Sequence, residues 1–440
     1  MKRVLVLGSG LVSGPMVKDL ARHDDIALTV GDADAAKAER AVAGHPRARA
    51  AAVSIEDAAR VAALVGDADL VVSLLPFPLH PKVARIAIDR RVPLITTSYV
   101  SPEMRALDRD ARAAGVLLLN EIGLDPGLDH MSAMRMIRGA RHQGRRLLSF
   151  RSCCGGLPAP EASTNPWGYK FSWSPRGVLA AGRNAARWLE DGSVVDVPGA
   201  ELFRRVTPYD VPGIGRLEVY PNRDATTYVA LYGIEGIQTM FRGTLRYPGW
   251  CETLDAASRL GLLDDTVRRF RAGTTYEGLM DALAAPGGGP VPDRVAARLG
   301  LAAGGDVMRR FEWAGLFSSI PLGSDALAPI DALCARLSAS MAYADGERDM
   351  IVLQHELATA DDAGKTALEK STLVAYGEPG GDSAMSRTVS LPAAAAARLI
   401  LDGKIGQTGV RIPVDPEIFD PVLDLLAPAG IVFHGSQTAP

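Results

Sequence analysis

The residues with the clearest chemical potential lie between positions 120 and 176, where glycine, proline, polar and aromatic residues are dense. Such a composition suits a site built from loops better than a packed core. Asp125 lies in a turn rich in proline and glycine, where its carboxylate can hold a substrate ammonium or move a proton. The competing interpretation is that Asp125 caps the next helix. Asp129 and His130 could form an acid-base pair, but adjacent residues of a helix point about 100° apart. We therefore expect His130 to pack at the start of the helix.

Two arginines provide a second kind of chemistry. Arg223 and Arg246 each lie in a polar segment beside an aromatic residue. A guanidinium group suits carboxylates, because its planar fork donates two parallel hydrogen bonds. Surface salt bridges are the alternative for both arginines. Lys170 could be a catalytic amine, but a structural ion pair explains it better, and Cys154 lacks the accompanying signature of a cysteine nucleophile.

The amino-terminal segment has the pattern of a dinucleotide-binding turn. A short apolar run at residues 4–7 leads into Gly8 and Gly10, and a helical pattern follows. Gly8 permits a tight turn and Gly10 lets a pyrophosphate approach bare backbone, while Ser13, where a third glycine is usual, is still small. Asp32 follows the next expected strand, about 20 residues further on, where an acid binds the ribose hydroxyls. A loop aspartate or a helix cap is the alternative interpretation of Asp32.

The same third of the chain alternates between strand and helix patterns. Runs of β-prone residues occur at 26–30, 70–75, 94–98 and 116–120, and helical stretches occur at 81–89 and 103–114. This alternation predicts an α/β fold with a Rossmann-type doubly wound parallel sheet. Ligands in such sheets bind beyond the carboxyl ends of the strands. The segments expected to converge near the reactive end of a cofactor are therefore residues 76–80, 97–99 and 121–125.

The pattern becomes mixed after about residue 147. Short β-like runs are expected at residues 147–153, 217–219, 226–231, 350–355 and 373–376, and they predict a second, mixed α+β domain. Residues 250–337 are mostly helical in pattern, with a break rich in glycine and proline at 287–292. The alanine-rich residues 391–401 have good helix propensity, and this helix can pack back on the nucleotide domain.

Length and charge limit the classes of function. A chain of 440 residues is expected to form two or three domains. A net charge of −3 with interspersed signs predicts no nucleic-acid partner, and no apolar run is long enough to span a bilayer. The first residues lack signal-peptide features, so we expect a cytoplasmic protein that acts on a small molecule. The four cysteines lack paired metal-ligand spacing, so we expect them to be reduced and predict no metal site.

Six motifs give the chain a family resemblance. The motifs are residues 8–12, 121–127, 154–161, 168–174, 220–224 and 242–247. Together they resemble saccharopine dehydrogenase of the L-glutamate-forming type, also called saccharopine reductase. The likeness continues through residues 333–336, 347–355 and 371–374, and so covers nearly the whole chain. Long ordered motifs at matching separations are far more specific than a glycine fingerprint.

The resemblance implies an activity in lysine metabolism. Saccharopine, NAD(P)+ and water would give L-glutamate and L-2-aminoadipate 6-semialdehyde, reversibly, through hydride transfer and hydrolysis of an imine. The resemblance also implies a homodimer of three-part subunits. The expected parts are an NAD-binding Rossmann domain at residues 1–123, completed by 390–440, a substrate-binding and dimerisation α+β domain at 124–249 and 338–389, and a helical domain at 250–337.

Site residues follow from the resemblance motif by motif. The implied substrate contacts are Ser98, Tyr99, Asp125, Arg223, Thr244, Leu245, Arg246 and Tyr247, with Asp125 the catalytic candidate. The implied cofactor contacts are Ser9, Gly10, Leu11, Val12, Leu75, Thr97, Ser98, Leu124, Pro126 and Ser174, beside Gly8 and Asp32. A substrate with three carboxylates and two amines agrees with arginine clamps and an opposing carboxylate.

One position departs from the family pattern. The fungal reductases have an arginine where this chain has Asp32. Arginine suits the 2′-phosphate of NADP, whereas a carboxylate binds the ribose 2′-hydroxyl of NAD and repels a phosphate. The expected cofactor is therefore NAD rather than NADP. Two alternatives stay open: an enzyme like carboxynorspermidine dehydrogenase of polyamine synthesis, against which the paired arginines argue, and a non-catalytic NAD-binding sensor or scaffold.

Overall fold

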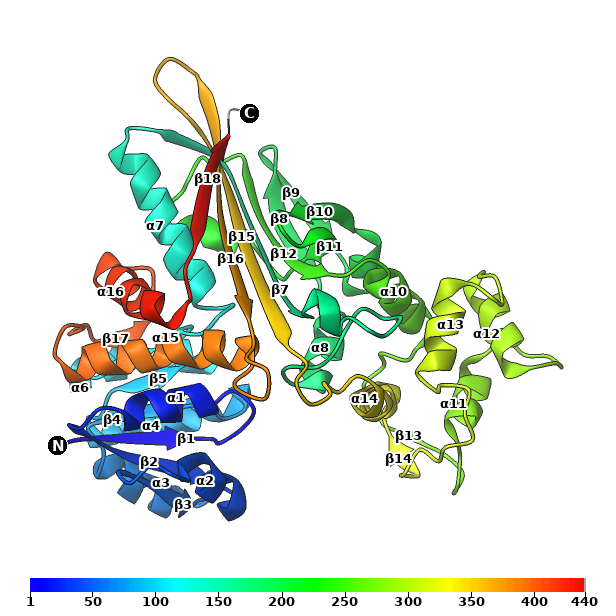
Figure 1. Cartoon of the computed structure of the whole chain (residues 1–440), viewed down its shortest axis with the longest axis horizontal. Helices are drawn as coiled ribbons and strands as arrows, with labels where there is room; N and C mark the ends of the chain where they lie inside the picture. The colour runs from blue at the N-terminus through cyan, green and yellow to red at the C-terminus, as the bar shows by residue number, and fades with distance from the viewer. Residues whose placement is uncertain (439–440) are drawn as a thin grey trace. The chain divides into compact units, whose positions relative to one another are not determined.

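The computed structural model describes residues 1–438, which form two compact units (Figure 1). One unit combines Met1–Leu148 with the carboxyl-terminal residues from 353 onward, and the other unit is Ser149–Val352. Short 3-10 turns lie at Phe77–Leu79, Pro160–Ala162, Gly199–Arg204 and Ala427–Ala429.

A seven-stranded parallel sheet forms the centre of the first unit. Its strands are β1 (Lys2–Leu7), β2 (Ile26–Asp32), β3 (Ala48–Ala52), β4 (Leu70–Ser73), β5 (Leu94–Thr96), β6 (Leu117–Leu119) and β17 (Gly409–Arg411). They lie in the order β17-β6-β5-β4-β1-β2-β3, and every neighbouring pair is parallel. The strand order reverses between β1 and β4, as in doubly wound α/β folds. The predicted fold class is confirmed.

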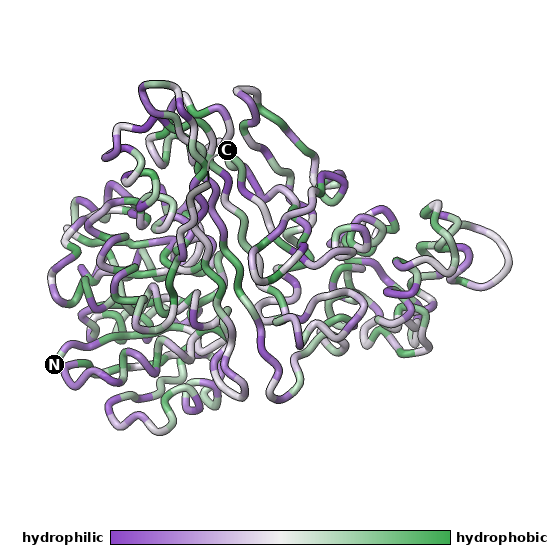
Figure 2. The backbone as a smooth tube through the Cα atoms, turned by 45° about the horizontal axis from the view of Figure 1, so that its top comes forward, coloured by the Kyte–Doolittle hydropathy of each residue, from purple (hydrophilic) through white to green (hydrophobic). Residues whose placement is uncertain are grey.

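Helices cover both faces of this sheet. They include α1 (Gly14–Ala21), α2 (Ala35–Val42), α3 (Ala58–Gly66), α4 (His80–Arg90), α5 (Pro102–Ala106) and α6 (Asp108–Ala114). Leu5 and Leu7 of β1 share a core with α3, α4 and α6, while the alternate residues Val4 and Val6 are also buried. Burial on both faces explains why β1, β4, β5 and β6 consist mainly of continuous apolar runs. Their hydropathy can be followed along the tube in Figure 2.

The alanine-rich segment forms α15 (Ala384–Leu401), which packs against α1 (Figure 1). Residues 393–397 are buried alanines, and their small side chains let α15 lie close to its neighbours. After α15 the chain enters β17, where Gly409 is opposite Leu117 of β6. The carboxyl-terminal part of the chain therefore extends the amino-terminal sheet.

The first unit contains five further elements. They are α7 (Leu128–His142), β15 (Asp349–Ala360), β16 (Thr366–Tyr376), α16 (Pro416–Leu426) and β18 (His434–Thr438), and the boundary between the units falls within β15. Strands β16 and β18 are antiparallel. Helices α7 and α16 pack together, and Arg135 and Arg138 of α7 both donate hydrogen bonds to Asp420 of α16.

A mixed sheet and a helical segment make up the second unit. The strands are β7 (Arg146–Pro158), β8 (Ala186–Glu190), β9 (Ser193–Val197), β10 (Thr207–Val211), β11 (Gly215–Pro221) and β12 (Thr239–Arg246). Strand β12 is parallel to β7, and the pairs β10–β11, β11–β12, β8–β12 and β8–β9 are antiparallel. The helices are α8 (Pro175–Ala181), α9 (Thr227–Leu231), α10 (Trp250–Leu260), α11 (Tyr276–Leu283), α12 (Val291–Leu299), α13 (Asp306–Trp313) and α14 (Pro329–Ser340), and β13 (Arg268–Arg269) pairs with β14 (Ala326–Leu327).

One predicted strand is wrong. The pattern at residues 226–231 predicts a strand, whereas the structure has helix α9 there. Asp224 explains the difference, because its carboxylate accepts hydrogen bonds from the backbone nitrogen of Thr226 at 2.9 Å and from its hydroxyl at 2.5 Å. Such side-chain bonds favour a turn that starts a helix over a strand. So short an apolar run does not distinguish the two by periodicity.

Aromatic residues join the helical segment to the motif at 168–174. The ring of Trp167 lies 6.0 Å from that of Trp250 and 6.3 Å from that of Phe311, and Tyr169 lies 4.4 Å from Trp250. The indole of Trp167 also donates a hydrogen bond to the carbonyl of Arg310. The core of helices α10 to α14 therefore anchors this motif.

Candidate active site

The glycine turn after β1 leaves space for the phosphates of a ligand. Gly8 has a φ of +99°, which favours glycine, and a Cβ there would lie 3.0 Å from the carbonyl of Leu74. A Cβ on Gly10 would meet nothing within 4 Å, so open space lies beside its backbone. The hydroxyl of Ser13 donates a 2.9 Å hydrogen bond to the carbonyl of Gly10 and closes the turn before α1.

Asp32, at the end of β2, faces this turn. Its Oδ2 accepts hydrogen bonds from the backbone nitrogen of Ser9 at 2.8 Å and from the Ser9 hydroxyl at 2.7 Å. Its Oδ1 accepts a 2.9 Å hydrogen bond from the backbone nitrogen of Asp34. Burial alone would raise the pKa of Asp32, but the hydrogen bonds from Asp34 and Ser9 hold it below its usual value. The group beside the turn is therefore a carboxylate.

These residues fit a dinucleotide. The backbone at Gly10 is open, the amino end of α1 follows it, and the carboxylate of Asp32 lies at the same turn. Leu11 exposes 74% of its surface beside that space, which is unusual for a leucine and leaves an apolar face for a ligand. Residues 8–12 would hold the pyrophosphate of NAD(P), with Asp32 next to a ribose.

The loops after β4, β5 and β6 come together at the carboxyl ends of the strands, as the sheet direction predicts. A Cβ on Gly8 would lie 3.3 Å from the backbone nitrogen of Leu75, and one on Gly123 would lie 3.1 Å from the Cβ of Thr97. The backbone nitrogen of Glu121 donates a 3.1 Å hydrogen bond to the carbonyl of Ser98. These contacts place the expected cofactor positions after β4, β5 and β6 around one edge of the sheet.

Asp125 and Tyr99 meet at this edge. The phenol of Tyr99 donates a 2.9 Å hydrogen bond to Oδ1 of Asp125, and both side chains are partly buried. Tyr99 fixes the orientation of the carboxylate, and a carboxylate held this way can bind an ammonium or exchange a proton with it. The sequence predicted each residue separately, and the fold brings them together.

A second carboxylate supports the turn that leads into the next helix, α7. The carboxylate of Asp129, in the first turn of α7, accepts a 2.5 Å hydrogen bond from the backbone nitrogen of Gly127. This contact gives the turn a buried acceptor that does not involve Asp125. Gly127 has a φ of +148°, and a Cβ there would lie 2.1 Å from the carbonyl oxygen of Gly123, so the turn requires glycine.

Glu121 and His130 form a buried pair that the sequence did not reveal. His130 Nε2 lies 2.8 Å from one carboxylate oxygen of Glu121, and the other oxygen accepts a 2.9 Å hydrogen bond from the backbone nitrogen of Val100. The pair therefore ties the segment that carries Tyr99 to helix α7. The expected packing role of His130 agrees with its complete burial. The signal for Glu121 was its position two residues after the end of β6, where residues of the site were expected.

Arg246, at the end of β12 in the second unit, is a buried guanidinium without an acidic partner in residues 1–438. It is only 5% exposed, and its Cζ lies 5.0 Å from the ring centre of Tyr169, 5.7 Å from that of Trp250 and 5.9 Å from that of Tyr220. Its Nη1 donates a 2.7 Å hydrogen bond to the carbonyl of Leu245, and its Nε is buried without a partner. Arginine stays charged in proteins, so this buried guanidinium can bind an anionic group such as a carboxylate. The alternative of a surface salt bridge does not apply to Arg246.

The other expected substrate residues of the second unit have varied environments. Arg223 is exposed at the turn after β11 and has a φ of +54°. Leu245 has a fully buried side chain, so only its backbone can face a ligand. Thr244 is partly buried, and the hydroxyl of Tyr247 donates a 3.1 Å hydrogen bond to the carbonyl of Pro158.

Two further residues have structural contacts. The hydroxyl of Ser174 accepts a 3.2 Å hydrogen bond from the backbone nitrogen of Gly177 and so caps α8. Lys170 is 6% exposed, and its ammonium lies 2.6 Å and 2.5 Å from the two carboxylate oxygens of Glu347. This hydrogen bond lowers the pKa of Glu347. The structural ion pair predicted for Lys170 is confirmed.

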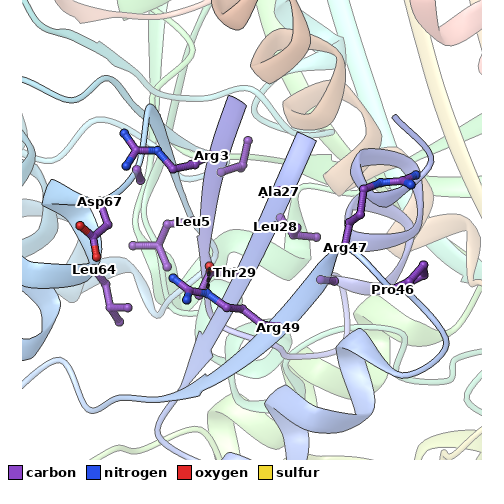
Figure 3. A pocket seen from close by; sticks show the side chains of 13 residues that line it. Arg3, Leu5, Ala27, Leu28, Thr29, Pro46, Arg47, Arg49, Leu64 and Asp67 are labelled. Atoms are coloured by element: carbon purple, nitrogen blue, oxygen red, sulfur yellow. Dashed lines mark hydrogen bonds between the residues drawn. The ribbon is translucent and has the colours of Figure 1, made fainter. Parts of the chain in front are cut away.

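A cavity of about 500 Å³ lies on the first unit but away from this edge. It is lined by residues near the amino ends of β1, β2 and β3, including Arg3, Ala27 and Arg49 (Figure 3). Arg3 is paired with Asp69, and Arg49 donates to the hydroxyl of Thr29. Cofactors of doubly wound sheets bind at the carboxyl ends of the strands, so this cavity is not the dinucleotide site.

Residues 1–438 contain neither a cluster of metal-ligand side chains nor a membrane-spanning helix. No group of three or more histidine, cysteine, aspartate or glutamate residues there is arranged to hold a metal ion. No helix within the same residues is long and apolar enough to cross a membrane.

Together, the doubly wound sheet, the glycine turn and the polar loops define a dinucleotide-dependent oxidoreductase. A family model described as the saccharopine dehydrogenase NADP binding domain matches residues 4–119, and one described as the saccharopine dehydrogenase C-terminal domain matches residues 123–431. The chain belongs to the saccharopine dehydrogenase family.

Individual relatives agree with this assignment. The chain is 40% identical to saccharopine dehydrogenase [NADP(+), L-glutamate-forming] of Saccharomyces cerevisiae over 96% of both chains. It is 39% identical to the mitochondrial alpha-aminoadipic semialdehyde synthase of Rattus norvegicus, of which it matches 48%. The solved apo structure of the Saccharomyces cerevisiae saccharopine dehydrogenase (L-Glu forming) has a TM-score of 0.90, with 37% identity and full coverage of both chains.

Proposed function

We propose that this protein converts saccharopine, NAD(P)+ and water into L-glutamate, L-2-aminoadipate 6-semialdehyde, NAD(P)H and a proton, reversibly, as a step of lysine metabolism. The observation that carries the proposal is the similarity to enzymes of this name along the whole chain. The geometry supports it, because the chain provides a dinucleotide turn, a carboxylate held by a phenol and a buried guanidinium that has no acidic partner in residues 1–438.

Asp125 has the central role in the proposed mechanism. NAD(P)+, when bound, accepts a hydride from the substrate carbon that becomes the aldehyde. The carboxylate of Asp125 holds the secondary ammonium of saccharopine or takes its proton, which leaves the nitrogen lone pair available to form the imine. Tyr99 keeps the carboxylate oriented through its 2.9 Å hydrogen bond. Water then adds to the imine carbon, and the carbinolamine collapses as the proton returns to the nitrogen of the leaving glutamate.

The substrate carboxylates are the proposed partners of the arginines. Arg246 is buried among aromatic rings, with no acidic side chain beside it in the described part of the chain, so a carboxylate that enters would satisfy both its charge and its unpartnered Nε. Arg223, exposed on its turn, would bind a second carboxylate. The further proposed substrate contacts are Ser98, Tyr99, Thr244, the backbone of Leu245 and Tyr247.

The cofactor contacts are proposed for the edge formed by the glycine turn and the strand ends. They are Gly8, Ser9, Gly10, Leu11, Val12, Asp32, Leu75, Thr97, Ser98, Leu124 and Pro126, with Ser174 from the second unit. We further propose that NAD is preferred over NADP, although the yeast relatives are named as NADP(+) enzymes. The supporting observation is the Asp32 carboxylate, whose negative charge would repel a 2′-phosphate.

The organisation of the chain follows as a set of proposals. We assign cofactor binding to residues 1–123 with 390–440, substrate binding and dimerisation to 124–249 with 338–389, and a supporting role to the helices at 250–337. We propose a homodimer in the cytoplasm. Sedimentation of the purified protein and microscopy of the tagged protein in its own cell test these two points.

A steady-state assay of the purified protein tests the function. With saccharopine and NAD+ we expect NADH to form together with glutamate, and we expect weaker activity with NADP+. Carboxynorspermidine serves as the matched alternative substrate, because the same imine chemistry would oxidise it. Preference for carboxynorspermidine, or binding of NAD without turnover of either substrate, would contradict the proposal.

A further inference from the structure

His80, the first residue of α4, connects the ends of two strands beside the cofactor edge. Its ring is 3% exposed, and Nδ1 lies 2.9 Å from the hydroxyl of Ser73 at the end of β4. On the other side of the ring, Nε2 lies 2.9 Å from the hydroxyl of Ser98 and 3.1 Å from that of Thr96. One imidazole therefore contacts three hydroxyl groups from two neighbouring strands and the loop that follows them.

The ring is held as a neutral imidazole. Burial lowers the pKa of His80 to about 4, and the hydrogen-bond partners of its ring in residues 1–438 are all hydroxyl groups. Either neutral tautomer satisfies these contacts, because a hydroxyl group can both donate and accept. Ser73 and Thr96 are buried, whereas Ser98 is partly exposed. Ser98 is thus the member of the cluster that can reach a ligand.

Ser98 depends on His80 for its side-chain position. The backbone of Ser98 is fixed separately, since its nitrogen donates to the hydroxyl of Thr96 and its carbonyl accepts from Glu121. Its hydroxyl has His80 as its hydrogen-bond partner in residues 1–438. Removal of the imidazole would therefore free the rotamer of Ser98 while leaving the backbone of the loop in place.

We propose that His80 is a positioning residue of the dinucleotide site, whose Nε2 holds the Ser98 hydroxyl in the orientation that contacts the nicotinamide end of the cofactor. The proposal rests on the proposed cofactor contact of Ser98. It assigns to His80 a role in binding that does not require the histidine to touch either ligand or to change its charge.

A double-mutant cycle on dinucleotide affinity tests the proposal. The dissociation constant of NAD+ is measured by fluorescence titration for wild type, His80→Leu, Ser98→Ala and the double variant, with melting temperatures alongside. Loss of one hydrogen bond predicts an increase of about 3- to 10-fold for each single variant. If His80 acts through Ser98, the double variant shows about the same increase as either single variant. If the increase in the double variant is instead the product of the two single increases, the residues act independently and the proposal is overturned.

Amide substitutions separate positioning from packing. Glutamine places its amide nitrogen near the site of Nε2, whereas asparagine places it near Nδ1, so His80→Gln should restore the affinity for NAD+ and His80→Asn should not. These two variants also keep the test decisive if His80→Leu folds poorly. His142→Gln, at the exposed end of α7, is the control and should bind NAD+ as the wild type does. Equal affinities of His80→Gln and His80→Asn would overturn the proposal.

The result of the NAD+ affinity cycle can be distinguished from the result of the saccharopine assay. A cycle with coupled effects in a protein that does not oxidise saccharopine supports the role of His80 and rejects the activity. Turnover of saccharopine with an unaltered NAD+ affinity in Ser98→Ala supports the activity and rejects the role of His80.

Discussion

The phenol of Tyr99 donates a 2.9 Å hydrogen bond to the carboxylate of Asp125, which joins the loop after β5 to the turn after β6. Neither residue is an isolated surface group, since both are partly buried at the carboxyl edge of the parallel sheet. In the same turn the carboxylate of Asp129 binds the backbone nitrogen of Gly127. The turn therefore contains one carboxylate directed to the phenol and another that supports the backbone.

Asp125→Asn separates a catalytic role of Asp125 from a structural one, because the substitution keeps the shape of the side chain and removes its charge. We expect kcat/KM for saccharopine to fall about 100-fold or more, as for a typical acid-base group, with NAD+ affinity and melting temperature largely unchanged. Asp129→Asn is the matched control. In contrast to Asp125→Asn, its main effect should be on the melting temperature rather than on turnover. Near-normal turnover of Asp125→Asn would reassign Asp125 to structure.

Asp32→Arg tests the choice of cofactor. A like charge against the 2′-phosphate costs several kcal/mol, so we expect the wild type to prefer NAD+ and the variant to lose that preference by about 100-fold or more in the ratio of kcat/KM. Asp34→Ala removes the neighbouring carboxylate that caps α2, and should cost about 1 kcal/mol of stability without changing the ratio. A wild type that prefers NADP+ would reject the assignment.

Arg246→Met tests the proposed carboxylate clamp. Loss of a charge-assisted bidentate contact should lower kcat/KM for saccharopine by a factor that corresponds to about 2 to 4 kcal/mol of activation free energy. Arg246→Lys should restore little of the lost activity. Because the native guanidinium is buried with no acidic partner among residues 1–438, we expect the melting temperature of Arg246→Met not to fall. Arg310→Met is the control: Arg310 donates to the carbonyl of Pro166 and the hydroxyl of Thr253, so its loss should lower the melting temperature. Wild-type kcat/KM in both Arg246→Lys and Arg223→Ala would contradict the clamp.

Gly10→Ala and Gly8→Ala form a pair that distinguishes ligand space from backbone space. A methyl group on Gly10 meets no protein atom, so we expect unchanged stability and an increased dissociation constant for NAD+. A methyl group on Gly8 meets the carbonyl of Leu74 at 3.0 Å and requires a positive φ, so we expect a lower melting temperature. Equal NAD+ affinity in Gly10→Ala and wild type would place the pyrophosphate elsewhere.

His80 predicts a pH dependence of stability. Its pKa is lowered to about 4 in the folded protein, from an ordinary value of about 6.5, so the unfolded chain binds the extra proton between these values. The contribution of neutral His80 to the free energy of unfolding is therefore complete above pH 6.5. It is lost as the pH falls toward 4, which lowers the free energy of unfolding by on the order of 2 to 3 kcal/mol. Denaturant unfolding at pH 7 and pH 4.5 should show this loss, and His80→Gln should reduce it. If wild type and His80→Gln lose the same free energy of unfolding between pH 7 and pH 4.5, His80 does not titrate in this range.

The nucleotide-binding part of the fold could be predicted from local sequence patterns. The run before Gly8, the spacing to Asp32 and the alternation of strands and helices depend on local propensity and on burial of both faces of a parallel sheet. These signals lie in contiguous residues, so they predicted the doubly wound fold and the edge at which the loops meet. The motifs also indicated Asp125 and Arg246 as candidates, but not the side chains that contact them.

Which groups face one another depends instead on the tertiary structure. Tyr99 and Asp125 are 26 residues apart, His80 reaches hydroxyl groups on two strands, and the rings around Arg246 come from β11, α10 and the loop at Tyr169. Such contacts depend on strand order and on rotamers fixed by packing, which no local pattern contains. For the same reason α9 replaced the predicted strand at 226–231, because a hydrogen-bonded turn at Asp224 outweighed the weak preference of a short apolar run.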